Sequence, residues 1–399
     1  MFKSATAVVT PRRVVAVLLA TILSIHFLIH TANSSDTLQV QLASWSFTKM
    51  PATHSNNSNS AAPVKSTLAT LPVPSSTHSV AYNAPPSGRA NATFVFLARN
   101  SDIDGVAAAV QSVEDRFNRR HGYPWVFLND EYFTEQFMFR VRLLTDAPVF
   151  FGRIERDAWN QPDWIDEEKA RKGRLKLMSQ RIIYGGSVPY RNMCRFNSGF
   201  FFKHELLQQY RYYWRVEPGV KYFCDLSYDP FKMMQEQEKV YGFTISLMEH
   251  KATVATLWQA VKEFIEQHPE HIDPNNALDF VSDDAGANYN LCHFWSNFEI
   301  ADMDFWRAPA YQAFFDFLEA KGGFYYERWG DAPVHSIAAA LFARRDQIHF
   351  FRDIAYRHDD FEHCPAGEQY AANRCSCNPD TSFDYTDHSC LRRFENLFS

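Results

Sequence analysis

A strand, a helix and a second strand follow one another near residue 93, and this order constrains the fold more than any other feature. Residues 93–98 (TFVFLA) form an apolar run typical of a buried strand. Residues 101–119 carry apolar side chains at helical spacing, and residues 124–128 (PWVFL) are a second apolar run. Such a unit joins parallel strands through a right-handed crossover. The sequence therefore predicts an α/β fold with a mixed, mainly parallel sheet flanked by helices.

The α/β pattern continues to the C-terminal part of the chain. We expect further helices near residues 166–184, 204–214, 229–238, 253–267, 309–321 and 333–344. We expect further strands near residues 148–153, 198–202, 220–224, 241–247 and 348–352. Ligands bind at the carboxyl ends of the strands in sheets of this kind. Because no Gly-x-Gly-x-x-Gly follows the first strand, a dinucleotide cofactor is not supported.

The N-terminus predicts a membrane anchor. Residues 1–13 contain three basic side chains, and residues 14–32 form an apolar segment without Asp, Glu, Lys or Arg. As a helix, this segment spans about 28 Å, which suits a thin bilayer of the early secretory pathway. Positive charge on its N-terminal side predicts a cytosolic tail over residues 1–13 and a lumenal remainder. The competing interpretation is a cleaved signal peptide, although no clean Ala-x-Ala site follows.

The remainder divides into a stem and a folded domain. Residues 33–90 are rich in Ser, Thr, Asn, Pro and Ala, which predicts a disordered stem. Residues 91–399 form the predicted lumenal domain, and 46% hydrophobic content supports one large core. The net charge is −6 and no basic patch appears, so nucleic acid is not an expected partner.

The seven cysteines are placed unevenly. Four crowd the last 36 residues, at Cys364, Cys375, Cys377 and Cys390. In an oxidising lumen we expect disulfides there, whereas a zinc site usually shows Cys-x2-Cys or histidines at fixed spacing. The other three, Cys194, Cys224 and Cys292, lie in apolar surroundings. The odd total predicts at least one free thiol, and the spacing does not give the connectivity.

One carboxylate stands at a bend. Glu217 follows the aromatic run Tyr212–Trp214 and precedes Pro218 and Gly219, a pair typical of a tight turn. A fold can hold an acid in this way at the end of a strand, where it binds a divalent metal that in turn holds a diphosphate. A solvated turn residue is the competing interpretation.

Two other tracts carry candidate binding residues. Residues 188–202 offer side chains that can meet a phosphate or a sugar, namely Tyr190, Arg191, Arg195, Asn197 and Ser198. A loop entering a buried strand explains the same residues.

Residues 290–300 place Glu299 after an aromatic run, where packing would desolvate it, with His293, Trp295 and Asn297 beside it. An isolated acid of this kind can also be purely structural.

Two histidines late in the chain are candidate metal ligands. His358 lies in a predicted loop after the strand expected near 348–352, and imidazole is a common ligand of divalent metals. His335 is the rival candidate.

Five motifs in one order resemble the fungal Golgi α-1,2-mannosyltransferases, glycosyltransferase family 15. They are YRNMCRFNSGFF at 190–201, YYWRVEP at 212–218, YGFTI at 241–245, CHFWSNFEI at 292–300 and DAPVHS at 331–336. The similarity covers roughly residues 90–365. It implies a GT-A-type, Rossmann-like fold, GDP-mannose as donor, Mn²⁺ as metal and retention at the anomeric carbon. It also implies a single-pass type II protein of the Golgi membrane.

The resemblance also implies roles for single residues. Glu217 takes the place of an Asp-x-Asp metal ligand, and His358 matches a late metal ligand. Glu299 matches the residue proposed as nucleophile, and Tyr190 matches a tyrosine near the donor. Two departures are Gly219, where many relatives carry a polar or acidic residue, and Arg357, where a histidine is common.

The acceptor stays open at this point. N-glycans, O-glycans and glycolipids are all compatible with the resemblance. The alternative function is a catalytically inactive relative that binds glycans or acts as a scaffold subunit of a mannosyltransferase complex.

Overall fold

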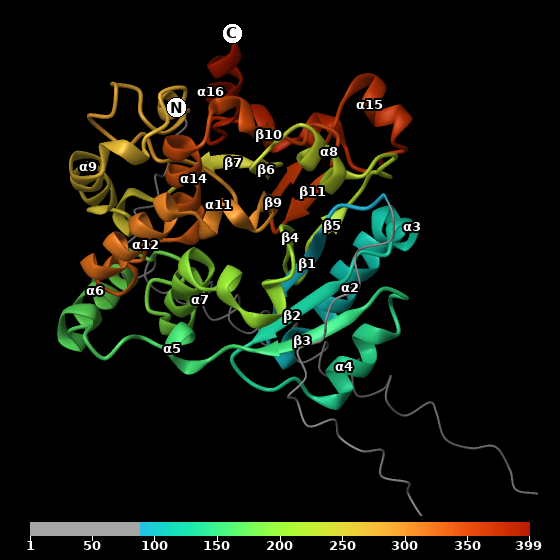
Figure 1. Ribbon diagram of the computed structural model, residues 1–399, viewed down its shortest axis with the longest axis horizontal. Coiled ribbons are helices and arrows are strands. Elements are labelled where there is room, and N and C mark those ends of the chain that lie inside the picture. The colour runs from blue at the N-terminus through green and yellow to red at the C-terminus, as the bar shows by residue number, and fades with distance from the viewer. Residues whose placement is uncertain (1–87) are drawn as a thin grey trace, which may run out of the picture. The chain divides into compact units, whose positions relative to one another are not determined.

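A computed structural model of the protein describes residues 88–399, and Figure 1 shows their arrangement. The predicted cytosolic tail, the predicted anchor and nearly all of the predicted stem lie outside the described residues. Within residues 88–399, no helix combines the length and apolar character that crossing a bilayer requires.

A seven-stranded sheet forms the centre, in the order β10-β6-β9-β4-β1-β2-β3. Strands β3, β2, β1 and β4 run parallel to one another, β9 is antiparallel to β4 and β6, and β10 is parallel to β6. The predicted mixed, mainly parallel sheet is therefore confirmed. The strands are β1 (Ala92–Leu97), β2 (Trp125–Asn129), β3 (Val149–Arg153), β4 (Tyr212–Val216), β6 (Tyr241–Phe243), β9 (Glu299–Asp302) and β10 (Ile348–Phe350).

The predicted strand–helix–strand unit is present. Helix α2 (Ile103–Val113) connects β1 to β2 through a π-helical turn (Glu114–Asn118) and α3 (Arg119–His121). The buried residues of α2 recur at helical spacing, at Val106, Ala109, Val110 and Val113. Gly122 ends α3 with a φ of +65°, a left-handed conformation that favours glycine.

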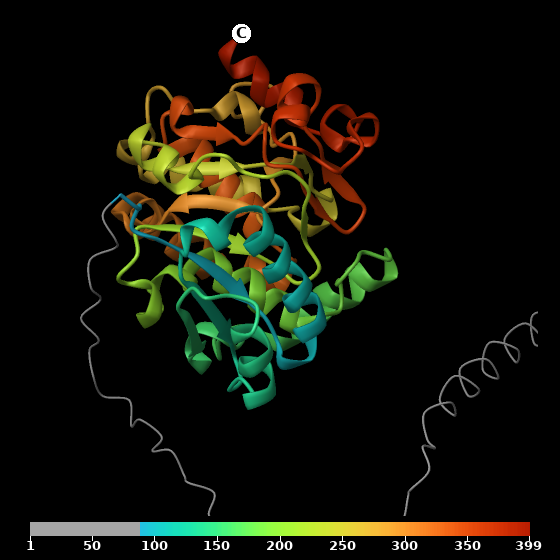
Figure 2. The same cartoon turned by 90° about the vertical axis from the view of Figure 1, so that its right-hand side faces the viewer.

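Helices cover both faces of the sheet (Figures 1 and 2). Alternate side chains of β1 point to opposite faces, so Phe94 and Phe96 join one apolar core and Val95 joins the other. The first core includes α2, α4 (Glu135–Arg142) and α8 (Pro230–Glu236), and the second includes α7 (Val188–Gly199), α9 (Leu257–Gln267), α12 (Pro309–Lys321) and α14 (Asp331–Phe342). The remaining helices are α5 (Arg156–Trp159), α6 (Glu167–Ser179), α10 (Leu278–Val281), α11 (Met303–Arg307), α13 (Gly323–Tyr326), α15 (Gly367–Ala372) and α16 (Leu391–Glu395).

Two small sheets bring distant segments together. One has the order β12-β11-β5, with β5 (Lys221–Tyr222), β11 (Tyr356–His358) and β12 (Phe361–His363). The other pairs β7 (Ser246–Met248) with β8 (Cys292–Phe294). In the first sheet Tyr222 lies opposite Tyr356, so the segment after β4 runs beside the strand that carries His358.

Two predictions around residue 200 are wrong. The predicted strand at 198–202 is the end of α7 followed by a 3-10 turn (Phe201–Lys203). Ser187 caps α7 through a bond from the Tyr190 amide, and Pro189 fits its first turn. The predicted helix at 204–214 is a short 3-10 turn (Glu205–Leu207) and then β4, whose aromatic residues pair with β1 and β9. Strand β9 was not predicted.

Three disulfides join the cysteines, and a disulfide-stapled tail is confirmed. They link Cys224 to Cys375, Cys292 to Cys390 and Cys364 to Cys377. Because all four cysteines of the tail are paired, none is left to bind zinc. The predicted free thiol is Cys194, which is buried in α7.

Candidate active site

Glu217 lies directly after β4, at the carboxyl ends of the parallel strands β1 and β4. The prediction of an acid at a strand end beside a turn is confirmed. Gly219 has a φ of +83°, which a side chain would strain, and its amide donates to the Gly105 carbonyl at 3.1 Å. The turn therefore favours glycine at the position where many relatives carry a polar or acidic residue.

The side chain of His358 points towards Glu217. Its Nε2 lies 3.9 Å from Glu217 Oε2, and both side chains are about one-fifth exposed. Two ligands that each stand about 2.1 Å from one metal ion are separated by at most about 4.2 Å. The pair can therefore share a divalent cation. Arg357 stands where a histidine is common in relatives. Its guanidinium lies over the Phe223 ring, 5.2 Å from the centroid, and not at the Glu217–His358 pair.

The CHFWSNFEI tract holds the other side of His358. Asn297 Nδ2 lies 2.8 Å from His358 Nδ1, and Tyr356 donates its hydroxyl to Asn297 Oδ1 at 3.1 Å. The ring of Trp295 packs edge-on against His358, with centroids 5.2 Å apart. Asn297 and Trp295 thus orient the imidazole. A metal-binding histidine donates its other ring N–H to an acceptor, which the Asn297 side chain offers once its amide turns.

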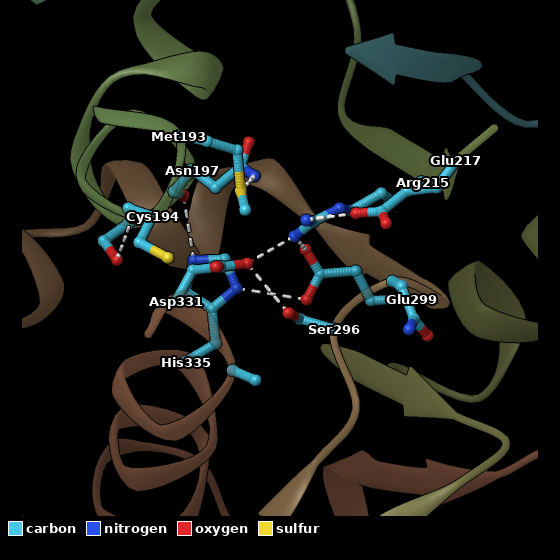
Figure 3. A network of polar contacts seen from close by, with 12 residues as sticks. Met193, Cys194, Asn197, Arg215, Glu217, Ser296, Glu299, Asp331 and His335 are labelled. Atoms are coloured by element: carbon cyan, nitrogen blue, oxygen red, sulfur yellow. Dashed lines mark hydrogen bonds and ion pairs between the residues drawn. The ribbon is translucent and has the colours of Figure 1, made fainter. Parts of the chain in front are cut away.

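A buried arginine connects Glu217 to two further carboxylates (Figure 3). Arg215 of β4 lies 2.5 Å from Glu217 Oε1 and 2.5 Å from Asp331 Oδ2, and 3.8 Å from Glu299 Oε1. Burial opposes its charge, but the carboxylates of Asp331, Glu217 and Glu299 outweigh burial and raise the pKa of Arg215 well above its usual value. Burial likewise opposes ionisation of Asp331, yet Arg215 and His335 lower the pKa of this carboxyl.

Glu299 is the centre of this network. It is 1% exposed, so the expected desolvation is confirmed. Its Oε1 accepts from the Tyr213 hydroxyl at 2.8 Å, and its Oε2 accepts from the Tyr241 hydroxyl at 3.0 Å. His335 Nδ1 lies 3.1 Å from Oε2. Both carboxylate oxygens therefore already have partners within the protein.

The side chains of three predicted donor-binding residues of α7 bond to other groups of the protein. Arg191 donates to the backbone carbonyls of Glu327, Ser187 and Gly185. Arg195 pairs with Glu319 at 2.7 Å, and Ser198 donates to the Cys194 carbonyl. Between residues 88 and 399, no side-chain contact joins these three to Glu217 or His358. Their role in donor binding stays a prediction.

Three more predicted residues lie among buried groups. Asn197 offers its backbone carbonyl to His335 Nε2 at 3.0 Å. The Arg328 guanidinium lies 5.0 Å over the Tyr190 ring, and burial raises the pKa of Tyr190 well above its ordinary value. His293 of β8 has a buried Nδ1 without a hydrogen-bond partner, and burial lowers its pKa.

Arg215 and Asp331 were not predicted as site residues. Arg215 stands two residues before Glu217, and side chains two apart on a strand share a face. The sequence alone could therefore have indicated that Arg215 lies beside Glu217. In the sheet Arg215 lies directly opposite Glu299. Asp331 comes from the start of α14, and no local pattern indicates its contact with β4.

A second group of potential metal ligands follows α9. His268, Glu270 and His271 place one ligand atom each within 4.8 Å of one another. Glu270 is exposed and both histidines are partly exposed. Within the described part of the chain, no contact connects this group to Arg215 or Glu217.

Comparison with known sequences identifies the family. The profile of a family described as "Glycolipid 2-alpha-mannosyltransferase" matches residues 40–398. The alpha-1,2 mannosyltransferase KTR1 of Saccharomyces cerevisiae is 53% identical over 310 residues, which are 77% of this chain and 79% of that protein. The O-glycoside alpha-1,2-mannosyltransferase omh1 of Schizosaccharomyces pombe is 48% identical over 313 residues, 78% of this chain and 80% of that protein.

Solved structures give the same result. Core-mannan synthase A (CmsA/Ktr4) of Aspergillus fumigatus in a Mn/GDP form is 39% identical, with a TM-score of 0.74 over 79% of this chain and 87% of that one. The mannosyltransferase Ktr4p of S. cerevisiae in complex with GDP is 40% identical, with a TM-score of 0.75 over 78% and 82%. The expected GT-A-type glycosyltransferase fold is confirmed. The resemblance seen in the five motifs is confirmed too, and the chain belongs to the glycolipid 2-alpha-mannosyltransferase family.

Proposed function

We propose that the protein is a retaining α-1,2-mannosyltransferase that moves mannose from GDP-mannose to mannose residues of glycoproteins or glycolipids. One observation carries this proposal. A carboxylate and an imidazole lie 3.9 Å apart at the carboxyl end of β4, beside a buried cluster of acids, in a chain of this family. Relatives named as α-1,2-mannosyltransferases, and relatives solved with GDP, support it.

Glu217 and His358 would hold the metal, which we propose to be Mn²⁺. Manganese accepts carboxylate oxygen and imidazole nitrogen, and a relative was solved in a Mn/GDP form. A metal held there would supply Lewis-acid chemistry that offsets the charge of the departing diphosphate. Arg215 fixes the orientation of Glu217 by holding its Oε1, which leaves Oε2 facing His358.

Glu299 is the proposed nucleophile. Retention requires either attack by a carboxylate on the anomeric carbon or attack by the acceptor from the face that the diphosphate leaves. Attack by Glu299 requires the sugar carbon to reach an oxygen that already accepts from Tyr213, or one that accepts from Tyr241 and faces His335. The second route leaves these bonds intact and uses Glu299 only as a buried negative charge. Variants of Glu299 separate the two routes.

We further propose that the protein is a type II Golgi membrane protein, anchored by residues 14–32 with its catalytic domain in the lumen. Three disulfides support a compartment of the secretory pathway, because cytosolic proteins rarely keep them. Nothing in the described site favours the inactive alternative, since Glu217, Glu299 and His358 are all present and Glu217 faces His358.

Transfer by the purified full-length chain tests the function. We expect incorporation of mannose from GDP-mannose into an α-mannoside, loss of transfer with EDTA and recovery with Mn²⁺. Linkage analysis of the product should give α-1,2-mannose. Parallel acceptors based on an N-glycan, an O-mannosyl glycan and a mannosylated lipid identify the acceptor class. Absence of transfer to all three, with GDP-mannose bound, would instead support the inactive alternative.

A further inference from the structure

We propose that His335 carries a proton on both ring nitrogens and is a positioning residue, an imidazolium that holds Glu299 as a carboxylate. The participation of Glu299 in transfer rests on the proposed function. The protonation of His335 rests only on the contacts around it.

The first ring proton follows from a backbone carbonyl. His335 of α14 is fully buried, and its Nε2 lies 3.0 Å from the carbonyl oxygen of Asn197 (Figure 3). A carbonyl oxygen only accepts hydrogen bonds, so Nε2 must donate. Asn197 also lies in the last turn of α7 (Val188–Gly199). The last carbonyls of a helix have no partner within the helix, and their partial negative charge favours a nearby cation.

The second ring proton follows from the partners of Glu299. Trp306 donates its indole N–H to the Tyr213 oxygen at 3.0 Å, so the proton of Tyr213 is free to point at Glu299 Oε1. The hydroxyl of Tyr241 donates to Oε2. Two donated bonds favour the ionised form of a carboxyl group. The remaining contact, from His335 Nδ1 at 3.1 Å, is then a third donated bond.

The charge balance of the cluster favours a second cation. Three carboxylates, Glu217, Glu299 and Asp331, surround the single guanidinium of Arg215. Glu299 is 1% exposed and Asp331 is 4% exposed, so two unpaired negative charges here would be costly. A charged His335 leaves one excess negative charge, on the side where Glu217 faces His358.

The groups that face His335 agree with a positive charge. They are the carboxylates of Glu299 and Asp331, the stacked ring of Trp306 at 4.3 Å, and the rings of Tyr311 and Phe201. Trp306 presents the face of its ring, which attracts a cation. Around His335, Arg215 is the cation that opposes this charge, and it lies against Asp331 and Glu299 rather than against the imidazole.

Nuclear magnetic resonance of the full-length chain, labelled with ¹⁵N-histidine, tests the protonation directly. We expect two slowly exchanging ring N–H signals for His335 near neutral pH. The chain has 15 histidines. The ring current of the stacked Trp306, and loss of the signals in His335→Gln, identify His335. A single ring N–H would overturn the proposal.

Kinetics test the positioning role. We expect His335→Gln to lower kcat by roughly 10- to 100-fold, as loss of a supporting contact does, with KM for GDP-mannose unchanged. Tyr311→Phe is the matched control, because its hydroxyl bonds to the Ser198 carbonyl beside His335 without touching Glu299. It should keep both N–H signals and near-normal kcat. Unchanged kcat in a folded His335→Gln protein would refute the positioning role. If the original chain shows no turnover, the proposed function fails, but the spectra still test the protonation of His335.

Discussion

Glu217 Oε2 faces His358 Nε2 at 3.9 Å, although the two residues come from different sheets. Glu217 follows a central strand of the large sheet, and His358 ends a strand of the three-stranded sheet. Pairing of β5 with β11 brings the two segments together.

Removal of either ligand should weaken metal binding. We expect Glu217→Ala and His358→Ala each to lower Mn²⁺ affinity at least about 10-fold and to abolish most transfer, because each removes a direct ligand. Calorimetry with Mn²⁺ and GDP measures the affinity. Asp359→Asn is the control, since its carboxylate lies 3.9 Å from His358 Nδ1 but is 80% exposed. Normal Mn²⁺ affinity in Glu217→Ala would contradict the assignment.

Replacement of Glu299 should stop transfer without loss of donor binding. If Glu299 attacks the sugar, we expect Glu299→Gln to lower kcat by roughly 1000-fold, which equals about 4 kcal/mol of transition-state stabilisation. Tyr241→Phe removes one bond to Oε2 and should cost only about 1 kcal/mol of stability. Steady-state rates and GDP-mannose binding test Glu299→Gln, and urea unfolding measures the stability of Tyr241→Phe. A fall of less than about 10-fold in Glu299→Gln would exclude covalent attack and favour the same-face route.

The amide of Asn297 should control the affinity of His358 for metal. A metal on Nε2 leaves the ring proton on Nδ1, which then needs an acceptor, so the Asn297 oxygen must turn towards it. Asn297→Ala should therefore lower Mn²⁺ affinity about 10- to 100-fold, as loss of a supporting bond typically does. Asn297→Asp keeps an acceptor and should bind Mn²⁺ nearly normally. Equal affinities for the two variants, measured by electron paramagnetic resonance of free Mn²⁺, would disprove this role.

Stability should fall in mild acid. Burial lowers the pKa of His349 in β10 to about 4, from an ordinary value near 6.5. Between these two values the unfolded chain binds a proton and the folded protein does not, so the free energy of unfolding decreases as pH falls. The loss from this one group reaches at most about 3 kcal/mol at pH 4. His121, His204 and His293 are shifted in the same direction by burial and add to it.

Urea unfolding at pH 7.5 and pH 5 measures this effect. His349→Gln cannot gain a proton in this range, so its stability should change less between the two pH values than that of the original chain. His388→Gln is the control, because His388 is exposed. The same pH dependence in His349→Gln and the original chain would show that His349 does not contribute.

The sequence predicts the parallel unit of β1, α2 and β2 because local patterns determine it. Around residue 200 local patterns mislead. The run Gly199–Phe202 looks like a strand, but Gly199 ends α7 and Phe201 begins a 3-10 turn. The buried polar side chains of α7 find partners elsewhere in the fold, as Arg191 does in the distant Glu327 carbonyl. Arg191 and Arg195 look like phosphate ligands for the same reason, since no sequence window contains Glu327 or Glu319, which they contact.

Two acids of the site, Glu217 and Glu299, and its histidine His358 were predicted, whereas Asp331 and the arginine that joins the acids were not. The five motifs indicate Glu217, Glu299 and His358. Arg215 and Asp331 come together from β4 and α14, and only the packing of helix against sheet creates that contact. Likewise, His335 was a candidate metal ligand in the sequence, whereas both its nitrogens are engaged by Asn197 and Glu299.

The disulfides have a consequence for the order in which this enzyme matures. Cys224 follows β5 and Cys364 follows β12, so bonds to Cys375 and Cys377 flank the three-stranded sheet that presents His358. One half of the proposed metal site is thus fixed covalently only after the chain has been oxidised. A newly made chain would acquire the proposed pair of metal ligands together with its disulfides, so activity would depend on oxidative folding.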